Sequence, residues 1–281
     1  VEPKADEVRI SVRASAVNRA DLLQRRGDYP PPPGASEILG LECAGVVDAV
    51  GADVTTLARG DEVCALLAGG GYAEKAVVPA AQVLPVPSGI SLVEAAALPE
   101  AFATAYLNLF LEADLAPGER VLVHAGASGV GTAAVQLCRA FGNPVFVTAG
   151  SDEKIARCVE LGAEAGSNRF REYFGERVAQ WTGGAGMDVI LDPVGGEYLE
   201  GNLESLNLEG RLVLIGLMGG AESNIHLGLM MAKRLRLLGS TLRARTVAKK
   251  GAIMSALNER VWPLIAAGNI KPIVDTVFPM V

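Results

Sequence analysis

A run of small residues between two apolar segments constrains the fold of this chain more than any other feature. The stretch VLVHAGASGVGTAAVQL, residues 121–137, starts with residues that fit a buried strand and continues with residues that fit a helix. Gly126, Ser128 and Gly131 occupy the three key positions of a GxGxxG pattern, and Gly129 follows the serine. Such a turn brings the N–H groups of a helix N-terminus close to a phosphate. We therefore predict a phosphate-binding turn, with a purely structural strand–helix turn as the alternative.

The order of the other elements predicts two domains. Short strand-like runs separated by Gly, Pro and Asp fill residues 8–87, whereas strands and helices alternate over residues 120–242. That alternation is typical of a parallel doubly wound sheet. We predict an α/β protein with a β-rich domain of residues 1–97 and 246–281 and a Rossmann domain of residues 98–245. A dinucleotide is expected in the cleft between them, at the carboxyl ends of the parallel strands.

Composition narrows the class of partner. The chain has 281 residues, 32 acidic and 25 basic residues, a net charge of −7 and a mean hydropathy of +0.30. This balance argues against a nucleic-acid or anionic-membrane surface, and no apolar run is long enough to span a membrane. The four cysteines form no CxxC pair, which favours free thiols in a reduced, cytoplasmic protein. Because the chain starts at Val1 and stops within the run TVFPMV, we expect both ends to be incomplete.

The residues after the second predicted Rossmann strand select the cofactor. NAD-binding proteins usually carry an acid there that accepts from the ribose 2′-OH, but residues 147–151 are VTAGS. Ser151 and Lys154 can bind a 2′-phosphate by hydrogen bond and by charge, and Arg169 after the next strand can add a second charge. We predict NADPH rather than NADH. The alternative is that Ser151 only caps a helix and the two basic side chains are solvated.

Longer motifs resemble a known family. The segment ASAVNRADLLQRRGDYPPPPGASEILGLECAGVV, residues 14–47, is similar to the signature of zinc-free NAD(P)H:quinone oxidoreductases of the medium-chain dehydrogenase/reductase superfamily. The motifs ALPEAFATAY, HAGASGVGTAAVQL, GSDEKIARCVELGA, LDPVGG, LIGLMGG and LRAR extend the resemblance over residues 8–278. Within that family the chain resembles the zeta-crystallin-like group, most closely the branch that a tumour suppressor induces in animals. The resemblance implies a Rossmann domain joined to a GroES-like catalytic domain.

The resemblance also concerns what the chain lacks. Zinc alcohol dehydrogenases of the superfamily carry a catalytic cysteine where Asn18 stands, and Gly-His-Glu where residues 40–42 are Gly-Leu-Glu. His124 and His226 are the only histidines, and neither lies near a cysteine pair in the sequence. Since zinc needs three or four converging ligands, we predict no metal site.

Two side chains are candidates for the reaction. A nicotinamide supplies the hydride chemistry, so the protein has to orient the substrate and donate a hydrogen bond to its oxygen. Tyr29, which is protonated at neutral pH, precedes the rigid proline run 30–33; simple packing on these prolines is its alternative role. The resemblance implies that Tyr29 and Asn18 face the cofactor, as the matching residues of family members do. We interpret both as catalytic residues that orient the substrate by hydrogen bonds. Arg19 and Asp21 are expected to form a structural ion pair.

The resemblance implies the remaining cofactor contacts. They are a threonine near the nicotinamide, a segment behind its ring, a segment that closes over it, and the phosphate-binding turn. The corresponding residues are Thr104; Gly216, Leu217 and Met218; Leu242 and Arg243; and Gly126, Ser128, Gly129, Val130 and Gly131. Asp192, at the end of another strand, fits a crevice acid or a structural hydrogen-bond acceptor equally well.

Together these features predict NADPH-dependent reduction of quinones, or of related conjugated enones, by hydride or electron transfer from the nicotinamide and without zinc. An enoyl-thioester reductase of the same superfamily is the alternative enzyme, and a nucleotide- or RNA-binding protein without turnover is the alternative outside catalysis. The apolar run LRLLGSTL, residues 235–242, is expected to be the edge strand of the Rossmann sheet. Because family members pair this edge across a two-fold axis, the resemblance implies a homodimer.

Overall fold

The computed structural model describes residues 1–279, which form two compact units. One unit comprises Val1–Ala103 and the segment from Leu242 onward, and the other comprises Thr104–Thr241. The sequence-based bounds lay a few residues away, at 97/98 and 245/246. Leu242 and Arg243 therefore belong to the first unit in the structure, rather than to the Rossmann domain in which they were expected. Among the described residues, no helix is both long and apolar enough to cross a membrane.

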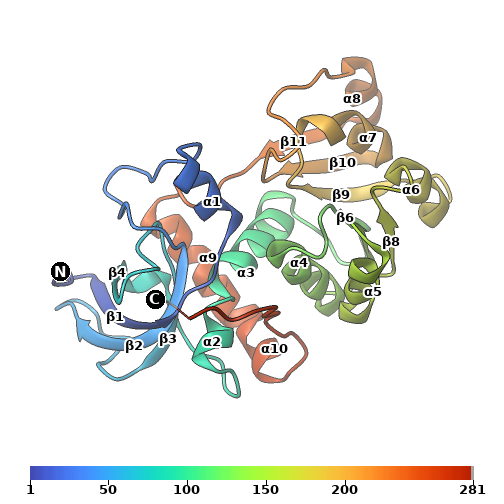
Figure 1. Ribbon diagram of the computed structural model, residues 1–281. Coiled ribbons are helices and arrows are strands. Elements are labelled where there is room, and N and C mark those ends of the chain that lie inside the picture. Colours follow the sequence, from blue (N-terminus) through green and yellow to red (C-terminus); the bar gives the residue numbers. More distant parts are fainter. Residues whose placement is uncertain (280–281) are drawn as a thin grey trace. The chain divides into compact units, whose positions relative to one another are not determined.

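The first unit is built on a five-stranded antiparallel sheet with the order β4-β1-β2-β3-β5 (Figure 1). In β1, side chains alternate between the core and the surface, so that Val8 and Ile10 are buried with Val47 and Val63 from neighbouring strands. The strands are β1 (Glu7–Ala14), β2 (Glu42–Val50), β3 (Glu62–Leu66), β4 (Lys75–Pro79) and β5 (Val83–Pro85).

Helices of the first unit carry a predicted site residue, Asn18, and an acid that sequence reasoning did not single out, Glu100. Asn18 is the N-cap of α1 (Arg19–Arg26), and Glu100 lies in the first turn of α3, which starts at Pro99. The other helices are α2 (Leu92–Ala95), α3 (Pro99–Tyr106), α9 (Val247–Arg260) and α10 (Trp262–Ala266), with a 3₁₀ turn η1 (Ala80–Gln82).

The second unit is a six-stranded parallel sheet with the order β11-β10-β9-β6-β7-β8. This order confirms the predicted doubly wound Rossmann sheet. Three strands at its centre, Val121–Val123, Val145–Ala149 and Met187–Asp192, are mostly apolar and almost fully buried, as covered parallel strands should be. The strands are β6 (Val121–Val123), β7 (Val145–Ala149), β8 (Ala165–Asn168), β9 (Met187–Asp192), β10 (Leu206–Leu214) and β11 (Arg236–Gly239).

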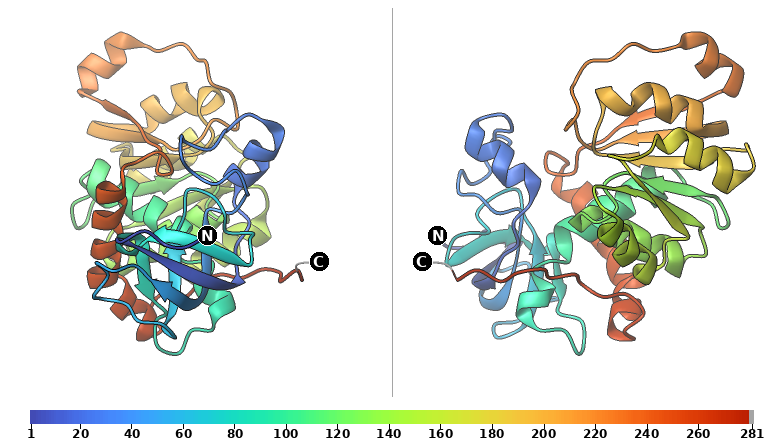
Figure 2. Two further views of the ribbon diagram at one scale, coloured as in Figure 1. Left: turned by 90° about the vertical axis from the view of Figure 1, so that its left-hand side faces the viewer. Right: turned by 45° about the vertical axis from the view of Figure 1, so that its right-hand side comes forward.

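Helices cover both faces of this sheet, with α4 and α5 on one face and α7 and α8 on the other (Figures 1 and 2). They are α4 (Gly129–Ala140), α5 (Asp152–Leu161), α6 (Phe174–Thr182), α7 (Leu199–Ser205) and α8 (Leu227–Lys233), with a π turn η2 (Leu107–Glu112) and a 3₁₀ turn η3 (Gly196–Tyr198).

The edge strand is shorter than the sequence indicated. The run of residues 235–242 was expected to be a strand throughout, but β11 ends at Gly239. It pairs with β10 only from Arg211 to Leu214, where β10 itself ends. The partner strand therefore limits β11 to four residues.

Candidate functional site

The turn between β6 and α4 admits only glycine at two positions. A Cβ on Gly126 would lie 2.6 Å from the Val147 side chain, and one on Gly131 would lie 2.5 Å from the Ala125 carbonyl oxygen. Ser128 is the N-cap of α4, and its hydroxyl accepts from the Gly131 N–H at 3.1 Å. Its side chain therefore serves the helix. The N–H groups of Gly129 and Val130, the first two residues of α4, have no intrahelical acceptor and suit an anion.

A buried set of polar side chains, here called the turn network (His124, Thr148, Asn202 and Asp192), fixes the start of this turn. The Asn202 amide nitrogen donates to Asp192 Oδ2 at 2.9 Å, so its Oδ1, 2.7 Å from His124 Nε2, is the acceptor. His124 Nδ1 then accepts from the Thr148 hydroxyl at 3.0 Å. The hydroxyl in turn accepts from the N–H of Ala125, which has a left-handed backbone (φ 54°).

Burial sets the charge state of the turn network. It lowers the pKa of His124 to about 4, so the ring is neutral at physiological pH. It raises the pKa of Asp192 to about 6, against the opposing effect of N–H donors from Val194, Gly195 and Asn202. Asp192 is thus a structural acceptor that ties the end of β9 to α7, which is one of its two interpretations from sequence.

The tip of β7 brings together two of the three predicted 2′-phosphate residues. Ser151 caps α5 by accepting from the Lys154 N–H at 3.3 Å. The Arg169 guanidinium stacks 4.5 Å from the Phe170 ring centre, and its Nε lies 3.8 Å from where a Cβ of Gly150 would be. The Lys154 side chain is exposed on the first turn of α5.

The acid nearest this strand tip is already engaged. Asp152 Oδ1 accepts from the Asn168 amide nitrogen at 2.7 Å, and its Oδ2 pairs with Arg171. Both carboxylate oxygens of Asp152 therefore already have a donor within the protein, whereas the Lys154 side chain is exposed. The turn and the tip of β7 together fit a nicotinamide dinucleotide.

A second buried polar set lies within the first unit around Asp21. One carboxylate oxygen accepts from the Gly40 N–H at 2.9 Å, and the other from the Asn18 N–H at 2.8 Å and the Tyr72 hydroxyl at 3.1 Å. The expected Arg19–Asp21 ion pair is wrong, because Asp21 is 2% exposed and accepts from these three donors, whereas Arg19 is exposed.

Two glutamates join Asp21 in what we call the acid cluster (Asp21, Glu42 and Glu100). Glu42 is 2% exposed and accepts from the Asn18 amide nitrogen at 2.8 Å and from the Glu100 N–H at 2.9 Å. Burial raises the pKa of Glu42 to about 7 and that of Glu100 to about 8, and for Glu100 the charge of Glu42 adds to the rise.

Arg243 anchors Tyr29. Its guanidinium donates to the Ala68 carbonyl oxygen at 2.8 Å, to Gln24 Oε1 at 2.7 Å and to the Tyr29 carbonyl oxygen at 3.3 Å, and it lies 5.4 Å from the Tyr29 ring centre. Lys250 in turn donates to the Arg243 carbonyl oxygen at 3.2 Å. Arg243 is only 3% exposed, so its side chain braces the first unit.

The contacts of Arg243 with Tyr29 involve its carbonyl oxygen and its ring but not its hydroxyl group. Within residues 1–279 it has no hydrogen-bond partner, although the ring is half-buried. Burial raises the pKa of Tyr29, which keeps the phenol protonated at neutral pH. The group can therefore donate a hydrogen bond to a bound molecule.

The other predicted positions are less specific. Thr104 is partly buried in α3, and its carbonyl oxygen accepts from the Asn108 amide at 2.7 Å. A Cβ on Gly216 would lie 2.7 Å from the Pro193 carbonyl oxygen. Leu217 and Met218 are exposed, as residues that receive a ligand can be, and Leu242 is buried.

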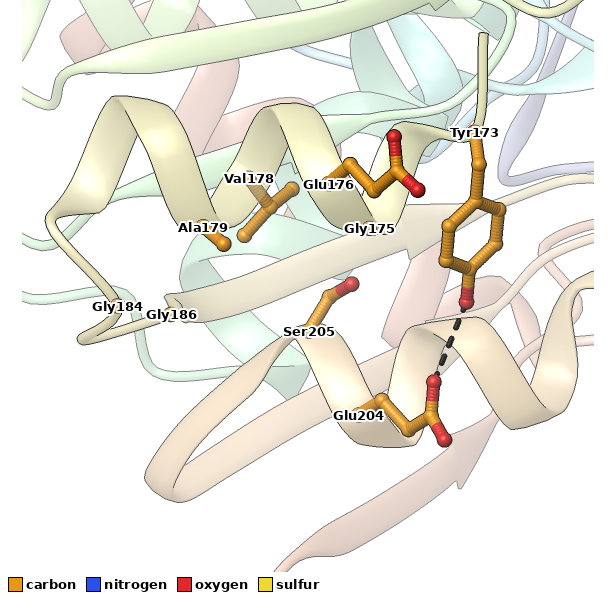
Figure 3. A pocket seen from close by; sticks show the side chains of 9 residues that line it. All are labelled: Tyr173, Gly175, Glu176, Val178, Ala179, Gly184, Gly186, Glu204 and Ser205. Carbon is orange, nitrogen blue, oxygen red and sulfur yellow. Dashed lines mark hydrogen bonds between the residues drawn. The ribbon is translucent and has the colours of Figure 1, made fainter.

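One hollow of the second unit lies apart from these residues. Side chains of α6 and α7 line it, with Ser205 pointing inward and the Tyr173 hydroxyl donating to Glu204 at 3.3 Å (Figure 3). None of the predicted cofactor residues lines this hollow. In the part of the chain that the structure describes, no three His, Cys, Asp or Glu side chains lie close enough to hold a metal ion.

Sequence reasoning missed Glu42, Glu100 and Asn202. Each lies in a segment whose sequence pattern was already explained by a strand or a helix, so no functional role was assigned to it. Their contacts join residues 24 to 78 positions apart, Asn18 with Glu42 and His124 with Asn202. The one available signal was charge: an acid within an otherwise apolar strand, as in GLECAGVV, indicates a buried acid with partners.

Comparison with known proteins follows the two units. Residues 4–88 match the family described as alcohol dehydrogenase GroES-like domain, and residues 129–257 match the family described as zinc-binding dehydrogenase. Quinone oxidoreductase-like protein 2 of Rattus norvegicus is 35% identical over 234 residues, which is 83% of this chain and 67% of that protein.

Two solved structures are similar over nearly the whole chain. The Escherichia coli quinone oxidoreductase complexed with NADPH is 31% identical, covers 98% of this chain and 84% of its own, and has a TM-score of 0.85. The CurK enoyl reductase is 32% identical, covers 99% of this chain and 85% of its own, and also has a TM-score of 0.85. These matches confirm the predicted pairing of a Rossmann domain with a GroES-like domain.

Proposed function

Because the chain belongs to the medium-chain dehydrogenase/reductase superfamily, with quinone oxidoreductase-like proteins as its relatives, we propose that it reduces quinones with NADPH. The observation that carries the proposal is the glycine turn of the second unit, in a chain similar over nearly its whole length to a quinone oxidoreductase that holds NADPH. The engaged carboxylate of Asp152 supports NADPH over NADH.

In this proposal the chain's own residues bind and orient. When bound, NADPH supplies a hydride, which with one proton converts a quinone carbonyl pair into a hydroquinone. The N–H groups at the start of α4 hold the pyrophosphate, and Ser151, Lys154 and Arg169 hold the 2′-phosphate. Tyr29 and Asn18 donate hydrogen bonds to the substrate oxygen on which negative charge develops.

Steady-state turnover tests the proposal. NADPH and NADH are each assayed with 1,2-naphthoquinone, 1,4-benzoquinone and a crotonyl thioester. We expect the highest kcat/KM for a quinone with NADPH, unchanged after incubation with a chelator because Asn18 replaces the zinc-ligating cysteine of zinc enzymes. A crotonyl thioester reduced faster than either quinone would favour the second candidate, an enoyl reductase, which the similarity to CurK supports.

We also propose a homodimer through β11. This strand ends the six-stranded sheet, and its Leu237 and Leu238 are partly exposed. An apolar edge strand invites pairing with a second copy across a two-fold axis. Light scattering at micromolar concentration is expected to give twice the chain mass, and a monomer would contradict the proposal.

A further inference from the structure

Both carboxylate oxygens of Glu42 are committed to N–H donors from different segments. Oε1 accepts from the side-chain amide of Asn18, which precedes α1, and Oε2 accepts from the backbone N–H of Glu100 in the first turn of α3. Glu42 itself starts β2 and is almost fully buried. It therefore links a candidate substrate residue to a rigid part of the sheet.

An ionised carboxylate dictates which end of the Asn18 amide faces it. A carboxylate only accepts hydrogen bonds, so the amide must turn its nitrogen, and not its oxygen, toward Glu42. The amide nitrogen carries two hydrogens in one plane. One is bound to Glu42, and the direction of the second is fixed by the first.

We propose that Glu42 is a positioning residue, whose carboxylate aligns the Asn18 amide so that its second N–H donates to the substrate oxygen. The assignment rests on the proposed function, because only that function gives Asn18 a substrate to meet. Glu42 is not placed in contact with the substrate and acts through Asn18.

Protonation of Glu42 would release this alignment. A protonated carboxyl can donate, and the Asn18 amide can then turn its oxygen toward Glu42. The surroundings make this protonation accessible, because burial raises the pKa of Glu42 to about 7 and the charge of Asp21 adds to the rise. The other titratable groups that interact electrostatically with Glu42 are Glu100, Tyr72, Cys43 and Cys64, and the cations that face Glu100 are Arg243 and Lys250.

The sign of the pH effect follows. Above about pH 7 Glu42 is ionised and Asn18 is aligned, and below it the alignment is lost. The kcat/KM for quinone should therefore fall on the acid side, with a midpoint near neutrality. The NADPH dissociation constant should not follow this midpoint, because Asn18 is assigned to the substrate.

Glu42→Gln is the test, because glutamine is similar in shape but has a single acceptor oxygen for two N–H donors. At about pH 8 we expect kcat/KM for 1,2-naphthoquinone to fall about tenfold, with NADPH affinity within about twofold and no remaining acid limb. In an Asn18→Ala background the same substitution should cost less than about twofold, since the residue it positions is gone. Glu62→Gln, at an exposed glutamate of β3, is the control for lost charge and should leave the profile unchanged.

A second readout does not depend on turnover. The side-chain amide signal of Asn18, assigned by its loss in Asn18→Ala, should shift with pH around neutrality in the parent and not in Glu42→Gln. A parent that turns over no quinone would overturn the proposed function, while this signal still tests the alignment. An Asn18 signal insensitive to pH, or a Glu42→Gln cost that persists in the Asn18→Ala background, would overturn the inference.

Discussion

The two units bury polar side chains in opposite ways. The turn network of the second unit gives its acceptors matching donors, and burial keeps its histidine neutral. The acid cluster of the first unit gathers three carboxylates, and two of them have pKa values raised toward neutrality. The comparison teaches that one polar region is built to be rigid where a phosphate is expected, whereas the other is built to titrate where a substrate is expected.

Removing the centre of the turn network should have the largest effect. His124→Ala deletes a ring that is 1% exposed and leaves the Thr148 hydroxyl without its acceptor and the Asn202 amide oxygen without its donor. We expect unfolding free energy to fall by about 3–5 kcal/mol, by the same amount at about pH 7 and about pH 9 because the ring is neutral throughout. Urea unfolding at both pH values measures it.

The second histidine is the matched control. His226 is exposed and caps α8 by accepting from the Leu229 N–H at 2.8 Å, so His226→Ala should cost only about 0.5–2 kcal/mol. Equal losses for the two variants would show that the turn network is no more than an ordinary surface contact.

The acid cluster should respond to pH where the turn network does not. Folded Glu42 keeps a proton up to about pH 7, whereas in the unfolded chain it ionises near 4.5. The stability this adds is complete below 4.5 and is lost as pH rises through 7, a difference of about 3 kcal/mol. Glu42→Gln cannot titrate. Relative to the parent, the variant should therefore gain stability between about pH 5 and about pH 8.

This measurement separates stability from activity. On acidification the parent should become more stable through Glu42 while its quinone turnover falls. A parallel decline of both in the parent, absent from Glu42→Gln, would mean that Glu42 supports the fold and nothing more.

Local patterns predicted the fold, and long-range contacts decided the site. The strand–helix alternation and the glycine turn at Gly126 and Gly131 are periodic or steric signals confined to short stretches, so the Rossmann sheet followed from sequence. The anchor of Tyr29 could not, because it comes from Arg243, 214 positions away. The cofactor contact assigned to Arg243 stays a prediction, because a motif identifies a segment but not the direction of its side chain.

Lys154, near the tip of β7, belongs neither to the turn network nor to the acid cluster. Its substitution tests whether an exposed charge, rather than a buried polar group, selects the cofactor. Lys154→Ala removes one charge-assisted contact to the expected 2′-phosphate, worth roughly 1.5–3 kcal/mol. The KM for NADPH should rise about tenfold or more, and that for NADH should change little. Arg157→Ala, on the same helix and paired with Glu160, is the control and should alter neither KM. An equal rise in the KM values for NADPH and NADH would show that Lys154 does not contact the 2′-phosphate.

The smallest expected effect concerns one hydroxyl group in the first unit. Tyr29→Phe keeps the ring on Arg243 and removes only the phenolic O–H, which has no partner among residues 1–279. Losing one neutral donor to a developing oxyanion should cost on the order of 1–3 kcal/mol, or roughly five- to 150-fold in kcat/KM. The loss should be smaller for quinones of high reduction potential, and NADPH affinity should stay within about twofold because the hydroxyl is assigned to substrate.

Tyr72→Phe is the same substitution at a hydroxyl that the protein does use, since it donates to Asp21 at 3.1 Å. That variant should lose about 1–3 kcal/mol of unfolding free energy, because a charged acceptor is left short of a donor, whereas Tyr29→Phe should lose less than about 0.5 kcal/mol. Thermal unfolding and quinone turnover of the two variants should therefore diverge. If Tyr29→Phe keeps full activity on quinones of low and of high reduction potential, the phenol has only a packing role. Substrate orientation would then depend on Asn18 and on the Glu42 carboxylate that holds it. If it loses NADPH binding instead, the ring contacts the cofactor and its assignment to substrate is wrong.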